Sequence, residues 1–132
     1  MADSFSSTLA NAVLNVLNGT TIATNAYTTT GNVFVQIHTA APGTAGTTAV
    51  SAGSATRQSV TFGTASAGSI AITGTPQWTN GGTSETITDI SIWSAVTAGT
   101  FLASGPLTTS QAWASGNILQ LSSLSVAIPT AS

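Results

Sequence analysis

The chain has 132 residues, of which only 3% are charged: Arg57 is the single Lys or Arg, and the acidic residues are Asp3, Glu85 and Asp89. A typical globular domain carries about 25% charged residues, and here 18 serines and 25 threonines take their place. One arginine cannot neutralise a series of phosphates, so we expect no nucleic-acid partner. With 42% hydrophobic residues and a net charge of −2, the composition is not that of a disordered protein.

The length fits a single domain over residues 1–132, large enough to bury a core without disulfides, and the chain has no cysteine. The first residues lack the basic and apolar regions of a secretory signal. No stretch reaches the roughly 18 consecutive apolar residues that a membrane span needs. We therefore expect no membrane partner, and synthesis in the cytoplasm as a soluble chain.

The first predicted element is a short amphipathic helix over residues 6–18. Apolar residues recur at helical spacing from Leu9 onward, and Ser6 and Ser7 are candidate N-caps. Asn18-Gly19 is a typical helix stop, so we expect the helix to end there.

After the helix the hydrophobic period changes to two residues. Val33, Val35 and Ile37 alternate with larger or polar neighbours, which is typical of a strand buried mainly on one face. Further strand-like runs cover residues 58–62, 69–73, 76–79, 86–93, 100–103 and 118–128. These runs predict a mainly β fold of about seven to eight strands, as an antiparallel β-sandwich or a partly closed barrel.

The last run has two hydrophobic phases. Leu119 and Leu121 share one parity, whereas Leu124 and the apolar residues after it share the other. A bulge or break near Ser122-Ser123 would place all of them on one face.

Two connections carry specific expectations. Thr79-Asn80-Gly81-Gly82 has the residues of a tight turn, which predicts a hairpin between the runs 76–79 and 86–93. Residues 39–56 are Ala, Gly, Thr and Ser around Pro42 and have no sustained period, so we expect a long, partly ordered loop. Such loops often carry contacts, and Pro42 and Val50 are candidate partner contacts.

Side chains able to carry chemistry are few, and we predict no catalytic residue, cofactor, cofactor-binding residue or metal site. His38 lies at the end of the first predicted strand, where we expect a structural imidazole bonded to a loop backbone. Glu85 and Asp89 would lie on one face of a strand about 13 Å apart. That separation is too large for a catalytic carboxylate pair, so we expect solvated surface charges.

Arg57 is the residue most suited to a structural clamp. Its guanidinium could donate to carbonyl oxygens and tie the 39–56 loop to the sandwich, or could pair with Asp89 or Glu85. A contact between subunits and a ligand site are the alternatives. Among the three tryptophans, buried anchors are the commoner role, and Trp113, in the predicted turn 110–116, is the one expected to face a partner.

Several runs together resemble a family of small structural proteins of tailed-bacteriophage virions. The first is Val33–Gly43, followed by Val50–Gly53 and Arg57–Gly63; the second is Ile90–Ala95 with Ala98–Leu102. The resemblance covers most of the chain. It implies a β-sandwich without enzymatic activity, found in the virion and bound to other virion proteins.

Two departures from the family pattern concern the arginine. Members of the family often have an aromatic residue before it, where this chain has Ala55-Thr56, and an acidic residue after the tryptophan, where it has Ser94. If that acidic residue is the usual partner of the arginine, Arg57 needs other acceptors, which favours carbonyl oxygens.

Three functions follow in order of preference. The first is a capsid decoration protein, which would bind the major capsid protein in many copies on the head lattice. We prefer it to a fibre because the chain has no shaft repeat, heptads or receptor domain. The second is a minor tail or tail-fibre-associated protein, and the third is a carbohydrate-binding module. We expect the long loop and the helix to form the interface with the partner. The same surface could also join like subunits into a homo-oligomer. Because the chain carries so little charge, binding at this interface should depend little on salt.

Overall fold

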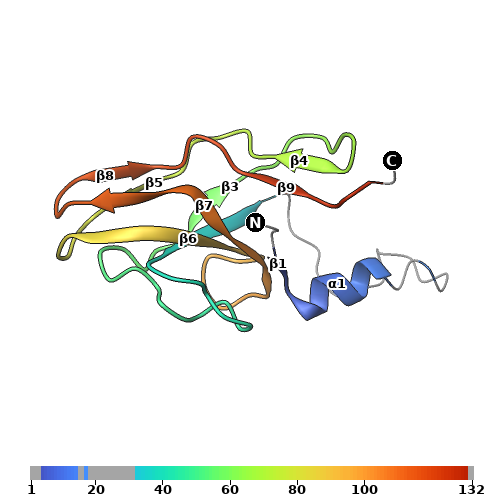
Figure 1. Ribbon diagram of the computed structural model, residues 1–132, viewed down its shortest axis with the longest axis horizontal. Helices are drawn as coiled ribbons and strands as arrows, with labels where there is room; N and C mark the ends of the chain where they lie inside the picture. Colours follow the sequence, from blue (N-terminus) through green and yellow to red (C-terminus); the bar gives the residue numbers. More distant parts are fainter. Residues whose placement is uncertain (1–3, 15–16, 18–31, 131–132) are drawn as a thin grey trace.

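The computed structural model describes residues 4–14, 17 and 32–130 (Figure 1). These residues form one helix and mainly β structure. The elements, in chain order, are β1 (Ser4–Phe5), α1 (Ser7–Leu14), β2 (Val33–His38), β3 (Gln58–Val60), β4 (Ser69–Ala71), β5 (Gln77–Thr79), β6 (Glu85–Trp93), β7 (Phe101–Trp113), β8 (Ile118–Gln120) and β9 (Ser125–Ala127).

The strands form two antiparallel layers. One layer is a five-stranded sheet in the order β1-β7-β6-β2-β3. The other consists of two ladders, β5-β8 and β4-β9, which follow one another along the layer as Figure 1 shows. The large sheet is open, ending at β1 and β3, so the expected mainly β fold is confirmed in its sandwich form.

The core lies between these layers. Alternate residues of β2, β6 and β7 point into it and meet Trp78 of β5. Its fully or nearly fully buried apolar residues are Val35, Ile37, Val60, Trp78, Ile87, Ile90, Ile92, Leu102, Ala103 and Trp113.

The expected break near Ser122-Ser123 separates β8 from β9. Both Leu121 and Leu124 remain hydrogen-bonded to the neighbouring segment, through Leu121 N to Pro76 O at 3.0 Å and Ile72 N to Leu124 O at 2.9 Å. The break brings the leucines on either side of it against the same core.

The predicted hairpin at residues 79–82 is wrong. β5 pairs with β8 instead of β6, because the Trp78 side chain is buried opposite Leu119. Asn80 has a different role: it is 2% exposed, and its Nδ2 donates to Thr83 O at 3.1 Å and to Trp113 O at 2.9 Å. The asparagine thus joins the end of β5 to the end of β7.

Two features of β6 and β7 were not expected. β7 runs to Trp113, although its hydroxyl-rich second half has no apolar alternation and only residues 100–103 were predicted. β6 has a register shift between Ile87 and Asp89, and both Ile87 and Ile90 lie in the core although they are three residues apart. The shift places Glu85 and Asp89 on opposite faces, which corrects the expectation of a shared face.

The helix begins as expected. Ser6 Oγ accepts a hydrogen bond from Leu9 N at 3.2 Å, which makes Ser6 the N-cap of α1. The expected stop at Asn18-Gly19 lies outside the described residues. In the part of the chain that the structure describes, no helix is long and apolar enough to cross a membrane.

The 39–56 loop folds back over the outer face of the sheet, the face opposite the core. Its two arms are joined by Thr39 N to Ala49 O at 2.9 Å and by Thr48 N to Pro42 O at 2.9 Å. In Figure 1 the loop lies on the side of β6 away from β5. It buries polar residues of β2 and β6 that would otherwise face solvent.

Candidate functional site

A hydrogen-bonded chain of side chains lies under this loop. His38 and Ser91 have no exposed surface, and His38 Nε2 lies 2.7 Å from Ser91 Oγ. His38 Nδ1 lies 2.8 Å from the carbonyl oxygen of Thr48, and Trp93 Nε1 donates to Ser91 Oγ at 2.8 Å. The chain therefore joins the loop to β2 and β6.

The chain is satisfied only when His38 is neutral. Nδ1–H then donates to Thr48 O, and the Ser91 hydroxyl donates to Nε2 while accepting from Trp93. A protonated ring would leave the buried Ser91 proton without this acceptor. In agreement, burial lowers the pKa of His38 below 6.5, and the Thr48 carbonyl and Asp89 oppose this only in part.

Ser91 and His38 do not form a catalytic pair despite their short separation. Both side chains are inaccessible, and the Ser91 oxygen already accepts from Trp93. The third position of a triad is held by the carbonyl of Thr48 and not by a carboxylate. The geometry is that of the structural imidazole expected from the sequence.

Arg57 lies flat on the indole of Trp93, with its Cζ 3.6 Å from the ring centroid. Its Nη1 donates to the carbonyl oxygens of Ala95 at 3.0 Å and Ala98 at 2.6 Å. Both acceptors belong to the connection between β6 and β7. The arginine thus binds carbonyl oxygens, the acceptors that the departures from the family pattern favoured. It holds the connection between β6 and β7, however, and not the 39–56 loop as expected.

Glu85 holds the loop instead, a role that the sequence did not reveal. Its carboxylate accepts hydrogen bonds from the Ser51 hydroxyl, from Ala52 N at 3.2 Å and from Gly53 N at 3.1 Å. Consecutive backbone N–H groups facing one carboxylate form a small anion-binding nest. The expectation that Glu85 is a solvated surface charge is therefore wrong.

The three expected partner contacts are less accessible than predicted. Trp113 is 2% exposed, and its Nε1 donates to Asn117 O at 2.9 Å, so the ring is an anchor of the core with almost no surface open to contact. Pro42 is buried in the loop, and Val50 is half-buried in a β-bridge with His38.

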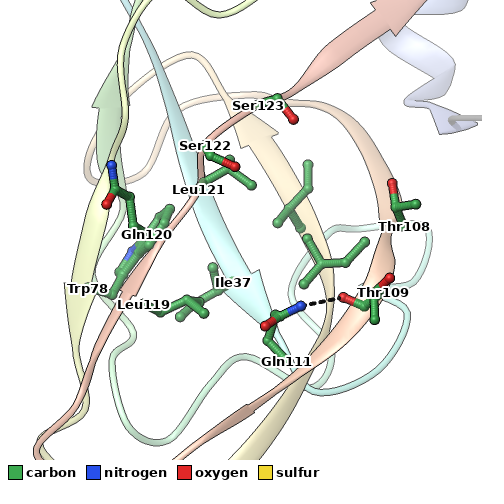
Figure 2. A pocket seen from close by; sticks show the side chains of 12 residues that line it. Ile37, Trp78, Thr108, Thr109, Gln111, Leu119, Gln120, Leu121, Ser122 and Ser123 are labelled. Carbon is green, nitrogen blue, oxygen red and sulfur yellow. Dashed lines mark hydrogen bonds between the residues drawn. The ribbon is translucent and has the colours of Figure 1, made fainter.

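A cavity of about 330 Å³ opens between β7 and the segment that joins β8 to β9, where the two layers are not paired (Figure 2). Ile37 and Trp78 lie on its inner side. Its rim carries hydroxyl groups, those of Thr108 and Thr109 on β7 and of Ser122 and Ser123 opposite. The cavity marks the open side of the sandwich.

A second hollow, here called the apolar groove, lies between α1 and the β4-β9 ladder. Its volume is about 560 Å³. Among the described residues that line it, Ser69 alone has a polar side chain, and the others are Phe5, Leu9, Ala10, Val13, Leu14, Ala65, Gly68, Ile70, Val126 and Ile128. Val13, Leu14 and Ile128 are 38%, 59% and 49% exposed, so large apolar side chains meet solvent there.

A third hollow, here called the Asp89 groove, lies on the outer face between the start of α1, the 39–56 loop and β7. Its volume is about 620 Å³. Of the described residues that line it, Asp89 is the one with a charge, and the other walls are Phe5, Ser6, Ser7, Ala41, Pro42, Gly43, Thr44, Phe101, Ser104, Gly105 and Pro106.

Comparison with known proteins identifies the family. Residues 4–129 match the family described as podophage GP4 fiber I protein gp80. The chain belongs to this family. The match covers every strand and α1, and it confirms the expected class, a structural protein of the phage virion that associates with other virion components. No curated protein compared with the chain matches it.

Proposed function

We propose that the chain is a non-enzymatic structural subunit of a phage tail fibre, which assembles with other virion proteins. The family description names a fiber protein, and this supports the tail-associated alternative over capsid decoration. The lack of a shaft repeat or heptads in this sequence does not oppose a fibre role, because a fibre can be built from several small chains.

The observation that carries an assembly role is the apolar groove. Monomeric proteins rarely leave contiguous apolar surface uncovered, and such surface is typical of protein interfaces. A small-molecule site needs a few polar groups to orient its ligand, and in the described part of this groove Ser69 supplies the only polar side chain. The groove therefore fits apolar side chains of a neighbouring virion polypeptide.

A carbohydrate-binding module has less support. Sugar platforms use exposed aromatic rings, but Trp78, Trp93 and Trp113 are 1%, 5% and 2% exposed. Trp78 and Trp113 lie in the core and Trp93 lies beneath Arg57, so none of the three can stack on a glycan without local unfolding.

The location is tested by the number of copies per virion. Quantitative mass spectrometry of purified particles should give a copy number close to that of known tail proteins, and far below that of the major capsid protein. Several hundred copies per particle would overturn the tail-fibre proposal.

The assembly role is tested by incorporation into particles. Leu14→Ser should reduce the amount of the protein in virions by at least about five-fold, because it places a hydroxyl in the apolar groove. Val96→Ser is the matched control, since Val96 is 53% exposed but lies in the connection between β6 and β7. Equal incorporation of the two folded variants would exclude the apolar groove as the interface.

A further inference from the structure

We propose that the Asp89 groove binds a Lys or Arg side chain of a different polypeptide. The inference names the partner chemistry of the assembly role and in that sense rests on the proposed function. It is carried by the unmet charge of Asp89, the apolar walls of the groove and the shortage of cations in this chain.

The charged residues that the structure describes differ in how far their charges are met. Arg57 is engaged by Trp93 and two carbonyl oxygens, and Glu85 accepts three hydrogen bonds. Asp89 differs from both: within the described residues, its one hydrogen bond comes from Thr88 Oγ1 to Oδ2 at 2.7 Å. Its Oδ1 therefore has an unused acceptor capacity, and the carboxylate has no cationic partner there.

The walls of the groove fit the stem of a long cationic side chain. Phe5, Pro42 and Phe101 supply apolar surface beside the carboxylate. Lysine and arginine bury their methylene stems along such surface while the charged head reaches a polar group. The amino end of α1, at Ser7, also borders the groove, but a helix end contributes only a partial positive charge and does not neutralise a carboxylate.

A Lys or Arg side chain that is free to enter the groove must come from another kind of chain. Arg57 is the only Lys or Arg in the sequence, and its guanidinium is held on Trp93 and the connection between β6 and β7. A second copy of this chain could offer its arginine only by breaking that clamp. A metal ion is a poorer occupant, because hard cations take six or more oxygen ligands and, among the described residues, Asp89 supplies the only carboxylate of the groove.

The test is a titration of the purified, isotope-labelled protein with Nα-acetyl-lysine amide, followed by NMR. Amide signals around Asp89 and Phe101 should shift and saturate. Nα-acetyl-norleucine amide has the same stem without the charge and should bind at least five-fold more weakly. Binding of the lysine derivative should also weaken as NaCl is raised to about 0.5 M, because screening acts on the charge contact. This salt dependence departs from the weak one that the composition predicts for contacts of the loop and the helix.

Variants separate the groove from general surface charge. Asp89→Asn should weaken binding of the lysine derivative at least five-fold. The double variant Asp89→Asn with Gln111→Glu restores the net charge on an exposed part of β7, and it should bind as weakly as Asp89→Asn.

Several outcomes would overturn the inference. The first is that the lysine derivative causes no saturable shift of the amide signals around the groove. The second is that the norleucine derivative binds as tightly as the lysine derivative. The third is that glucose, and not the lysine derivative, saturates the same signals. The comparison of the two derivatives uses only the unmodified protein, so it decides even if Asp89→Asn does not fold. A high copy number in the head would refute the tail-fibre proposal and leave this binding intact, so the two failures are distinguishable.

Discussion

The Glu85 carboxylate accepts a hydrogen bond from the Ser51 hydroxyl, which joins the first residue of β6 to the 39–56 loop. Ser51 Oγ in turn accepts from Ser54 N at 3.1 Å, and the next two backbone N–H groups after Ser51 also donate to Glu85. One carboxylate thus fixes the end of the 39–56 loop, which covers His38. This loop has a defined path, although its sequence predicts only partial order.

Glu85→Gln should lower the free energy of unfolding by about 1–3 kcal/mol, because a neutral amide replaces the charged acceptor of three hydrogen bonds. Urea unfolding followed by tryptophan fluorescence measures the loss. The exposed neighbour Thr86→Ser is the control and should change stability by less than about 0.5 kcal/mol. A loss as small as that of the control would show that the nest contributes little.

Arg57→Met should lower the free energy of unfolding by about 2 kcal/mol, because it removes the hydrogen bonds to Ala95 and Ala98 and the cation–π contact with the Trp93 ring. Thermal unfolding followed by circular dichroism should show unchanged strand content and a melting temperature lower by roughly 5–10 °C. Arg57→Lys keeps the charge but loses the planar fork, so its loss should be intermediate. Melting within about two degrees of wild type would rule out the clamp.

The stability of the protein should fall as the pH is lowered from about 7.5 to about 5.5. Burial lowers the pKa of His38 in the folded protein, so just below pH 6.5 the unfolded chain binds a proton that the folded chain excludes. The stability from the neutral ring is fully present above 6.5 and is lost as the pH falls through the folded-state pKa, with a slope of at most about 1.4 kcal/mol per pH unit. Urea unfolding across this range measures the slope.

His38→Gln is the matched variant for the pH series, because glutamine keeps polar groups but does not titrate. It should be less stable than wild type at pH 7.5 and should lose most of the slope above pH 5.5. A slope that persists in this variant would assign the pH dependence to other groups.

Gly46→Ala should destabilise the protein by more than about 1 kcal/mol. Gly46 has φ +73°, and a Cβ there would lie 2.5 Å from Cδ2 of Phe101. Gly74→Ala is the control, because a Cβ at Gly74 meets no atom within 4 Å and should be neutral or slightly stabilising. Thermal unfolding of both variants decides the comparison, and equal melting temperatures would mean that the loop does not pack on Phe101 in solution.

The local elements could be predicted from the sequence because hydrophobic period and capping act over a few residues. This applies to Ser6 as the cap of α1, to the alternation in β2 and to the break at Ser122-Ser123. The second half of β7 could not be predicted, because its hydroxyl-rich sequence has no alternation and becomes a strand only by pairing with β6. Likewise, β5 pairs with β8 because burying Trp78 outweighs the turn preference of the residues after it.

By itself, the sequence determined the scarcity of charge, the mainly β fold and the resemblance to phage virion proteins, since composition and periodicity are properties of the chain. Only the tertiary structure decided what each charge does. Ser51 and Glu85 are 34 residues apart, and Arg57 and Ala98 are 41 apart. A register shift within β6 sends Glu85 and Asp89 to opposite faces. Partners so distant in sequence meet only once the strands have paired, so folding gave Glu85 its nest and Arg57 its acceptors, and turned Asp89 toward an open groove.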